Sequence, residues 1–451
     1  MNALWTSAEI ESATLGRASQ PFTVTGLSID SRKLRPGDLY VAVKGESKDG
    51  HDFVANAFAA KAAAALVSKS ADAAGPLLTV AHTQRALDDL ARAARARSDA
   101  TVVAVTGSAG KTTTKEMLKL AFGAIGQTHV SGASFNNHWG VPFSLASLPR
   151  EAKFGVFEIG MNHFGEIRAL VPFARPHIAL ITTIAPAHLE FFGNCEAIAD
   201  AKSEIFEGII PGGTALIPAD SPYAERLVAR AKQQSVHRIL RFGSAAGCDA
   251  RLVSCEESGE GLRLKAEIMG KPVDARVGAP GTHIASNALG ALLCVAAAGG
   301  DVLNAAAALK EFAALKGRGA RLQAGGVEII DESYNANPAS MAAALSLLAK
   351  AKGRRIAVLG DMLEMGPEGA ALHAGLAPAL AAADFVFLCG PLMKSLWEAL
   401  PASRRTAYAP NSKELAPIVA AALAPGDTVL VKGSNGSRMS LIIDAVKARG
   451  P

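Results

Sequence analysis

A glycine-rich turn that ends in Lys-Thr is the segment of this sequence best suited to chemistry. The β-branched run 101–105 leads into TGSAGKTTT at 106–114, and a helix is expected to begin near Lys111. Backbone N–H groups of such a turn can face phosphate oxygens, Lys111 can add a positive charge, and the Thr112 hydroxyl can reach a bound Mg²⁺. The predicted triphosphate cradle comprises Gly107, Ser108, Ala109, Gly110, Lys111, Thr112 and Thr113.

The cradle is shorter than the usual template, which has a glycine where this chain has Val105, so its pattern is G-x-x-G-K-T. Alternatively, the two glycines could simply end a strand and leave Lys111 solvated. A cation in the first turn of a helix opposes the helix dipole, which favours an anionic ligand over this alternative.

Three further residues follow predicted strands of the same region. Glu158 ends the apolar run 154–159, where a carboxylate could hold the Mg²⁺ that Thr112 also contacts. His188 lies on a proline-containing loop, and Lys202 lies among acidic and apolar residues. Each alone could be an ordinary surface residue. Lys202 could act as a metal ligand only if its neutral amine took up CO₂ to become a carbamate.

The composition indicates a large globular α/β protein. The 451 residues are 49% hydrophobic, and 46 basic and 41 acidic residues are interspersed to give a net charge of +5. No run of basic residues indicates nucleic-acid binding, and no segment has the pattern of a secretory signal or an integral membrane span. The five cysteines lack metal-site spacing. We therefore expect a cytoplasmic protein.

The pattern of strands and helices predicts three domains. Residues 1–98 read as a small α/β domain, with strands around a Pro-Gly-Asp turn between Phe22 and Gly45, a helix over 53–65, a strand at 65–67 and a helix over 84–97. Residues 99–315 alternate strands and helices as in a parallel-sheet ATPase, with an antiparallel extension over 252–277. Residues 316–451 form a second βα series, predicted as a C-terminal Rossmann-like domain.

Taken in order, these residues resemble the Mur ligases, ATP-dependent enzymes that extend the peptide stem of the bacterial cell-wall precursor. The resemblance covers nearly the whole chain and includes His283-x-x-x-Asn287, Gly317-Arg318 and Asp331 after the residues above. Within the family, the segments 136–142, 331–338 and 360–366 are most similar to the member that adds D-alanyl-D-alanine to a UDP-N-acetylmuramoyl tripeptide. The Asp-Asn-Pro-Arg motif of the tripeptide-forming member is missing from this sequence.

The resemblance implies a role for each matching residue. Thr112 and Glu158 would bind one Mg²⁺, and His188 with carbamylated Lys202 would bind a second. Asn287 would contact the adenine of ATP, Asp331 its ribose, and Arg318 the transferring phosphate. Residues for the UDP-sugar would be Ser31, Arg32 and His51, and residues for the peptide and dipeptide would be Asn137, Tyr334, Asn335, Asn337, Lys432 and Ser434.

The expected reaction is amide formation through an acyl phosphate, carried out by a monomer whose domains close on the substrates. Two residue pairs depart from the family pattern, namely His138-Trp139 and Glu332-Ser333. The resemblance therefore does not define the peptide contacts at these positions. A nucleotide-dependent switch would share the cradle but would not need Lys202 or His188. Folylpolyglutamate synthase would share the core but would lack the first domain.

Overall fold

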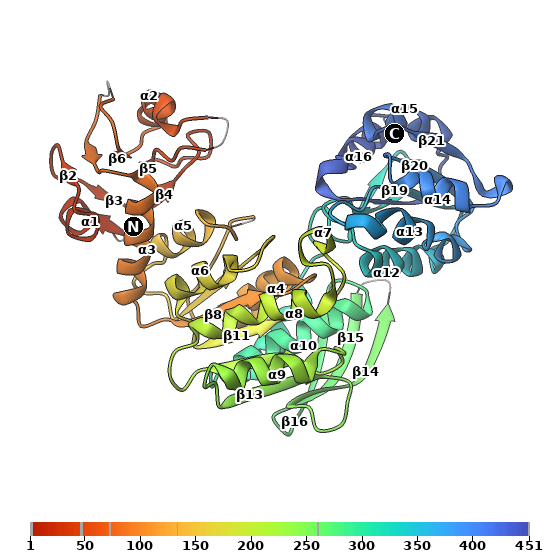
Figure 1. Cartoon of the computed structure of the whole chain (residues 1–451), viewed down its shortest axis with the longest axis horizontal. Helices are drawn as coiled ribbons and strands as arrows, with labels where there is room; N and C mark the ends of the chain where they lie inside the picture. The colour runs from red at the N-terminus through yellow and green to blue at the C-terminus, as the bar shows by residue number, and fades with distance from the viewer. Residues whose placement is uncertain (1–2, 46–47, 72–73, 133, 259–260, 450–451) are drawn as a thin grey trace.

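The computed structural model describes residues 3–45, 48–71, 74–132, 134–258 and 261–449. It has three parts, and the N-terminal and C-terminal parts stand on either side of the central part (Figure 1). Each part is built on its own sheet, as the three-domain α/β prediction requires. None of the helices in the described ranges is long and apolar enough to span a bilayer.

The N-terminal part is a five-stranded sheet of order β2-β7-β6-β5-β4 with a separate β1–β3 pair. Strands β4, β5, β6 and β7 run parallel. Its elements are β1 (Trp5–Thr6), α1 (Ser7–Thr14), β2 (Arg17–Ala18), β3 (Thr23–Val24), β4 (Gly26–Ser28), β5 (Asp38–Val41), α2 (Val54–Ala59), β6 (Ala64–Val67), β7 (Leu77–Thr79) and α3 (Thr83–Ala96).

One expectation for this part was wrong. The helix predicted over 53–65 ends at Ala59, whereas the strand predicted at 65–67 is confirmed as β6, which is fully buried between β5 and β7. Burial on both sides of a parallel sheet outweighs the helix propensity of alanine at these positions.

The central part is a nine-stranded sheet of order β16-β15-β14-β13-β12-β11-β8-β10-β9, parallel from β9 to β14 and antiparallel through β16. The antiparallel extension predicted over 252–277 is therefore confirmed. Its strands are β8 (Thr101–Thr106), β9 (Thr128–Val130), β10 (Phe154–Glu158), β11 (Ile178–Ile181), β12 (Thr214–Pro218), β13 (Arg238–Gly243), β14 (Ala250–Ser258), β15 (Gly261–Ile268) and β16 (Lys271–Val277).

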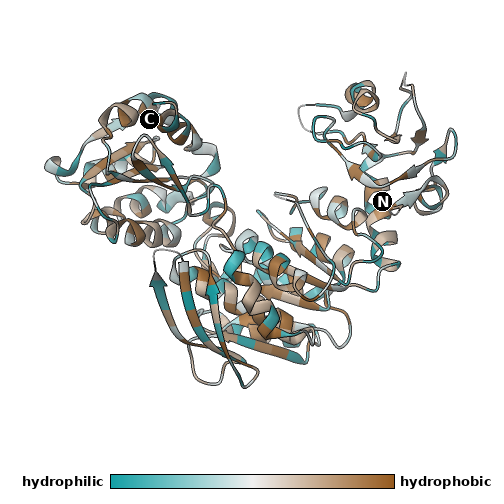
Figure 2. Cartoon of the chain, turned by 180° about the vertical axis from the view of Figure 1, so that it is seen from behind, coloured by the Kyte–Doolittle hydropathy of each residue, from teal (hydrophilic) through white to brown (hydrophobic). Residues whose placement is uncertain are grey.

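Helices bury both faces of this sheet, so its apolar strands are enclosed (Figure 2). They are α4 (Lys111–Gly123), α5 (Gly140–Ala146), α6 (Glu166–Ala174), α7 (Leu189–Phe192), α8 (Cys195–Ser203), α9 (Ala224–Gln233), α10 (Thr282–Ala297) and α11 (Val302–Ala308).

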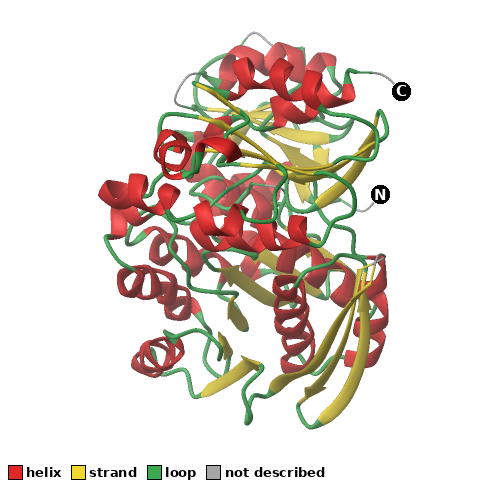
Figure 3. Cartoon of the chain, turned by 90° about the vertical axis from the view of Figure 1, so that its right-hand side faces the viewer, coloured by secondary structure: helices red, strands yellow, loops and turns green. Residues whose placement is uncertain are grey.

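The C-terminal part is a six-stranded sheet of order β17-β18-β22-β19-β20-β21, parallel except for β17, with helices on both faces (Figure 3). Because the chain returns to place β22 between β18 and β19, the strand order reverses there, as in Rossmann-like folds. Its elements are β17 (Ala320–Ala324), β18 (Val327–Glu332), α12 (Pro338–Ala349), β19 (Arg355–Gly360), α13 (Gly369–Ala374), β20 (Phe385–Cys389), α14 (Met393–Ala399), β21 (Ala407–Ala409), α15 (Ser412–Ala422), β22 (Thr428–Lys432) and α16 (Ser440–Lys447).

Candidate active site

The predicted phosphate cradle lies at the carboxyl end of β8, the middle of the central sheet. Gly107 (φ +153°) and Gly110 (φ +81°) have backbone angles that favour glycine, and a Cβ on Gly107 would lie 1.9 Å from the Thr182 hydroxyl. The turn is thus compact enough to press against the neighbouring strand. It delivers its backbone N–H groups to the start of α4, as an anion-binding turn requires.

Lys111, the first residue of α4, folds back over the turn and donates from Nζ to the Gly107 carbonyl oxygen at 2.6 Å. Burial lowers the pKa of Lys111, the carboxylate of Glu158 opposes that shift, and the charge of Arg318 adds to it. A buried ammonium beside a second cation is stabilised by an anion. The cradle therefore carries a positive charge that a bound phosphate group would neutralise.

Glu158 and Thr112 meet beside the cradle. The Thr112 hydroxyl donates to Glu158 Oε2 at 2.9 Å, and Asn136 Nδ2 donates to Glu158 Oε1 at 2.8 Å. Glu158 is only 3% exposed. The carboxylate and hydroxyl oxygens form the kind of donor set that Mg²⁺ prefers.

The sequence prediction named Asn137 but missed its neighbour Asn136. The structure uses the Asn137 side chain to accept the Gly140 N–H at 3.0 Å, at the start of α5, whereas Asn136 reaches Glu158. Two successive asparagines point in different directions, so the sequence alone gave no means to choose between them.

Lys202 lies on α8 and is 1% exposed. Within the described part of the chain, its Nζ has neither a hydrogen-bond partner nor an ion-pair partner. Burial lowers its pKa well below the ordinary value, and the positive charge of Lys111 lowers it further. The side chain is thus a buried amine held toward its neutral form, close enough to feel the cradle's charge.

His188 precedes α7 on the central part, and its Nδ1 forms a short contact with the Glu364 carboxylate of the C-terminal part. That hydrogen bond lowers the pKa of Glu364 against the opposing effect of its burial. Sequence reasoning did not find Glu364, because its partner is 176 positions away.

The three residues predicted to contact the nucleotide lie at the joint between the central and C-terminal parts or close to it. Asn287 on α10 is 8% exposed, and its amide oxygen would be 2.6 Å from a Cβ on Gly110. The Arg318 guanidinium stacks 4.0 Å from the Tyr334 ring centre. Asn287 thus lies against the cradle, and Arg318 lies close enough for its charge to act on Lys111 of the cradle.

Asp331 is fully buried, and its carboxylate is used inside its own turn. It accepts the Gly317 N–H at 2.9 Å, the Ser333 N–H at 3.1 Å and the Ser333 hydroxyl at 2.6 Å. In this conformation Asp331 shapes the Gly317 turn that carries Arg318 and presents no exposed oxygen to a ribose.

The remaining predicted peptide-site residues lie at the end of β22 or in the loops that follow β18 and β22. Lys432, 1% exposed, donates to Glu332 Oε2 at 3.1 Å and to the Asn335 carbonyl at 2.9 Å. Asn337 caps α12, while the Ser434 hydroxyl accepts the Leu363 N–H at 2.9 Å. These three side chains fix the loops.

Tyr334 and Asn335 are less constrained. The Tyr334 hydroxyl lies 3.1 Å from that of Ser134 in the central part, and Asn335 is exposed. Both therefore stand where the two parts of the molecule face each other.

A cleft of about 420 Å³ opens at the carboxyl ends of the neighbouring parallel strands β19, β20, β21 and β22. Its wall includes the exposed cations Lys413 and Arg438 and the buried carboxylate of Asp361. Burial raises the pKa of Asp361, although the N–H groups of Met393 and Leu392 oppose that shift. Sequence reasoning missed this cleft because its wall comes from four separate loops.

The predicted UDP-sugar residues follow the carboxyl ends of β4 and β5 in the N-terminal part, apart from the other site residues (Figure 1). Ser31 is half-buried, and the exposed Arg32 pairs with Asp30 at 2.8 Å. His51 contacts Asp49 through Nδ1 at 2.6 Å and accepts the Ser68 N–H at Nε2 at 2.9 Å.

Comparison with known proteins agrees with this arrangement along nearly the whole chain. Residues 23–107 match the profile of the Mur ligase family catalytic domain, residues 105–295 that of the Mur ligase middle domain, and residues 317–435 that of the Mur ligase glutamate ligase domain. The UDP-N-acetylmuramoyl-tripeptide–D-alanyl-D-alanine ligase of Escherichia coli is 36% identical over 95% of this chain and 95% of its own length.

Two crystal structures show the same fold. That of MurF from Acinetobacter baumannii is 31% identical, has a TM-score of 0.85, and matches 98% of this chain and 99% of its own. MurF from Thermotoga maritima in complex with ADP is 26% identical with a TM-score of 0.76, over 94% and 97% of the two chains. The chain described here therefore belongs to the Mur ligase family.

Proposed function

We propose that this protein is an ATP-dependent ligase that joins D-alanyl-D-alanine to UDP-N-acetylmuramoyl tripeptide, yielding the pentapeptide, ADP and phosphate in peptidoglycan precursor synthesis. The observation that carries the proposal is the hydrogen-bonded pair of Thr112 and the buried Glu158 at the phosphate cradle, within a chain related over nearly its whole length to ligases of that name. A nucleotide switch would need the cradle but would have no use for a second, buried amine beside it.

Each part of the molecule would have its own substrate. Residues 1–98 would bind the UDP-sugar through Ser31, Arg32 and His51, and residues 99–315 would bind ATP through the cradle and Asn287. Residues 316–451 would bind the dipeptide, and the exposed Lys413 and Arg438 of the 420 Å³ cleft are suited to its carboxylate. The enzyme would work as a cytoplasmic monomer.

The residues present fit Mg²⁺ at the cradle. Thr112 and Glu158 offer oxygen ligands at one point, and Asn136 holds the carboxylate in place. Bound there, Mg²⁺ would neutralise charge on the phosphates of ATP. Lys111 and Arg318, whose charges already act on each other, would offset the charge of the transferring phosphoryl group.

Lys202 fits a second metal position only as a carbamate. Its neutral amine can attack CO₂ to form an N–C bond, and the proton released from nitrogen leaves to solvent. The product is a carboxylate on a long stem. The structure supports this step through the amine's burial, its lack of a partner in the described part of the chain and its lowered pKa. His188 would be the other protein ligand.

Bond formation would follow in two steps. The tripeptide carboxylate attacks the γ-phosphorus of ATP, giving an acyl phosphate and ADP. The dipeptide amine then attacks the acyl carbon, phosphate leaves, and the amine loses a proton. Docking of the C-terminal part would bring Arg318 to the cradle and exclude the water that would hydrolyse the acyl phosphate.

An ADP-release assay with the full chain tests the proposal. We expect release to require ATP together with both UDP-N-acetylmuramoyl tripeptide and D-alanyl-D-alanine, and mass spectrometry to show the joined product. Parallel reactions with the diaminopimelate and lysine forms of the tripeptide would define the third stem residue accepted. Release with neither peptide substrate, or with folate and glutamate, would contradict the assignment.

A further inference from the structure

We propose that Glu364, on the C-terminal part, is a positioning residue that orients His188 of the central part for metal binding. The second metal position would then be complete only while the two parts are docked. This inference rests on the function proposed above, because it takes His188 as a metal ligand.

The hydrogen bond between the two side chains defines which imidazole nitrogen is free. His188 Nδ1 faces the Glu364 carboxylate, which can only accept, so Nδ1 carries the proton. In the neutral imidazole Nε2 then keeps its lone pair, and it has no hydrogen-bond partner in the described part of the chain. A carboxylate that holds one nitrogen of a metal-binding histidine fixes both the tautomer and the ring orientation.

The backbone at both partners is unusual in the same way. His188 has φ +58° and Glu364 has φ +63°, the left-handed region that residues with a side chain rarely adopt. Such conformations persist only where the surrounding structure holds them, and they gather at functional sites. Two residues with this backbone conformation contact each other across the joint, which indicates that the surrounding structure holds this contact in place.

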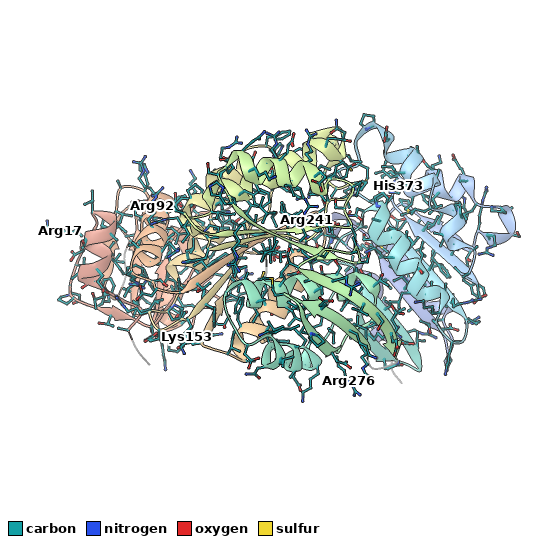
Figure 4. All side chains as sticks on the ribbon, turned by 90° about the horizontal axis from the view of Figure 1, so that it is seen from below. Arg17, Arg92, Lys153, Arg241, Arg276 and His373 are labelled. Carbon is teal, nitrogen blue, oxygen red and sulfur yellow. The ribbon has the colours of Figure 1, made fainter. Side chains whose placement is uncertain are left out.

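The loop that carries Glu364 is held from behind by His373 of α13, which Figure 4 labels on the C-terminal part. The ring of His373 is fully buried; Nε2 accepts the Met362 N–H at 2.9 Å, and Nδ1 donates to the Gly369 carbonyl at 2.6 Å. In front, the Glu190 N–H donates to the Glu364 carbonyl at 3.1 Å. Glu364 is therefore presented to His188 by a supported loop and not by a free chain.

The position of this contact couples metal binding to domain arrangement. His188 belongs to the central part that holds the cradle, whereas Glu364 moves with the C-terminal part. When the parts separate, His188 loses the acceptor that fixes its tautomer, and the metal position loses an oriented ligand. Metal binding in turn would favour the docked arrangement by the same factor.

The test compares Glu364→Ala with two matched variants of the full chain. Glu364→Gln keeps an oxygen that can accept from Nδ1, and Glu368→Ala removes an exposed acid of the same loop that forms neither a hydrogen bond nor an ion pair with His188 among the described residues. Mn²⁺ binding is measured by electron paramagnetic resonance in bicarbonate buffer with a non-hydrolysable ATP analogue. We expect two bound ions in the wild type, one of them weakened about 10–100-fold in Glu364→Ala.

The second readout is the tautomer of His188, followed by ¹⁵N spectra of histidine-labelled protein with His188→Asn as the assignment control. We expect the Nδ1–H form in the wild type and in Glu364→Gln, and its loss in Glu364→Ala. An unchanged tautomer in Glu364→Ala, a single Mn²⁺ in the wild type, or equal weakening in Glu368→Ala would overturn the proposal. Neither readout uses the peptide substrates, so a failed ligase assay would be a separate result.

Discussion

The central part of the molecule has two joints, and they are built from different kinds of contact. At the N-terminal joint, Trp5 and Ala146 belong to one apolar cluster, against which Trp139 and Phe143 also pack. At the C-terminal joint, the contacts are polar pairs such as Ser134–Tyr334 and His188–Glu364, and the described hydrophobic clusters end on either side.

This difference assigns different mechanical roles to the two joints. A shared apolar core resists separation because opening it would expose its surface to water, whereas polar pairs exchange readily for hydrogen bonds with water. The N-terminal part should therefore move together with the central part. The C-terminal part, which carries Arg318 and the cleft, should be the one that docks and releases.

The largest expected effect comes from Trp5→Ala. Trp5 is 2% exposed, its indole N–H donates to the Ala146 carbonyl at 2.9 Å, and the Arg97 guanidinium lies 3.5 Å from its ring centre. Truncation leaves a cavity and uncovers a guanidinium whose three nitrogens have no hydrogen-bond partner in the described chain. We expect a loss of about 3–5 kcal/mol in the free energy of unfolding, measured with urea.

Trp5→Phe serves as the control, because it keeps an aromatic ring and loses only the N–H group. It should cost clearly less than Trp5→Ala. If the wild type unfolded in two separate transitions, one for the N-terminal part alone, the idea of a shared core would be wrong.

Arg318→Ala tests the other joint, where the effect should fall on activity. Arg318 belongs to the C-terminal part, and its positive charge lowers the pKa of Lys111 in the cradle. Removing a group that stabilises charge in the transition state lowers kcat by about 10²–10³-fold. We expect that loss in the ligase assay with a stability change under about 1 kcal/mol. Arg318→Lys, which keeps the charge but not the planar fork, should retain part of the activity.

Equal destabilisation by Trp5→Ala and Arg318→Ala would break the comparison, since it would mean that both joints support the fold alike. Loss of stability without loss of kcat in Arg318→Ala would place the residue in packing against Tyr334 rather than at the cradle.

The sequence predicted the chemistry of the central part better than its geometry. Thr112 and Glu158 could be paired in advance because each follows a strand of one parallel sheet, and carboxyl ends of such strands share an edge. Asn136 could not be preferred over Asn137, since one residue of register decides which amide points at Glu158.

Local sequence patterns could not predict the contacts between the parts of the molecule. Glu364 and the 420 Å³ cleft depend on how separate loops meet, and no periodicity within one segment encodes that. The first alanine-rich helix shows the same limit on a smaller scale, because its end was predicted at residue 65 and lies at Ala59, and the helix propensity of alanine alone does not mark where a helix stops.

A pH titration can sharpen the comparison at the N-terminal joint, through the pair of Glu9 and Arg150. Partial burial opposes the charge of Glu9, but the Thr6 N–H and Arg150 outweigh it and hold the pKa of Glu9 below its ordinary 4.5. The folded state then binds fewer protons than the unfolded state, so this contribution is full above pH 4.5 and is lost as the pH falls further.

Because the pair is partly exposed, its contribution should be about 1 kcal/mol or less, and Glu9→Gln should remove only that part of the acid dependence. Unfolding curves between pH 3 and 6 measure the difference between the two proteins. A collapse of the N-terminal joint in Glu9→Gln at neutral pH would show that the joint depends on charge and not on its apolar core.

The smallest effect is expected for Lys350→Ala at the C-terminal joint. Lys350 Nζ lies 2.7 Å from Glu257 of β14, and the lysine side chain is 63% exposed. Exposed ion pairs contribute little because water screens the charges and the long side chain loses freedom, so we expect a few tenths of a kcal/mol. Lys352→Ala, an exposed lysine two residues away, is the matched control. A cost well above about 1 kcal/mol at Lys350 alone would mean that this polar joint is clamped, and that docking and release of the C-terminal part require more than exchange with water.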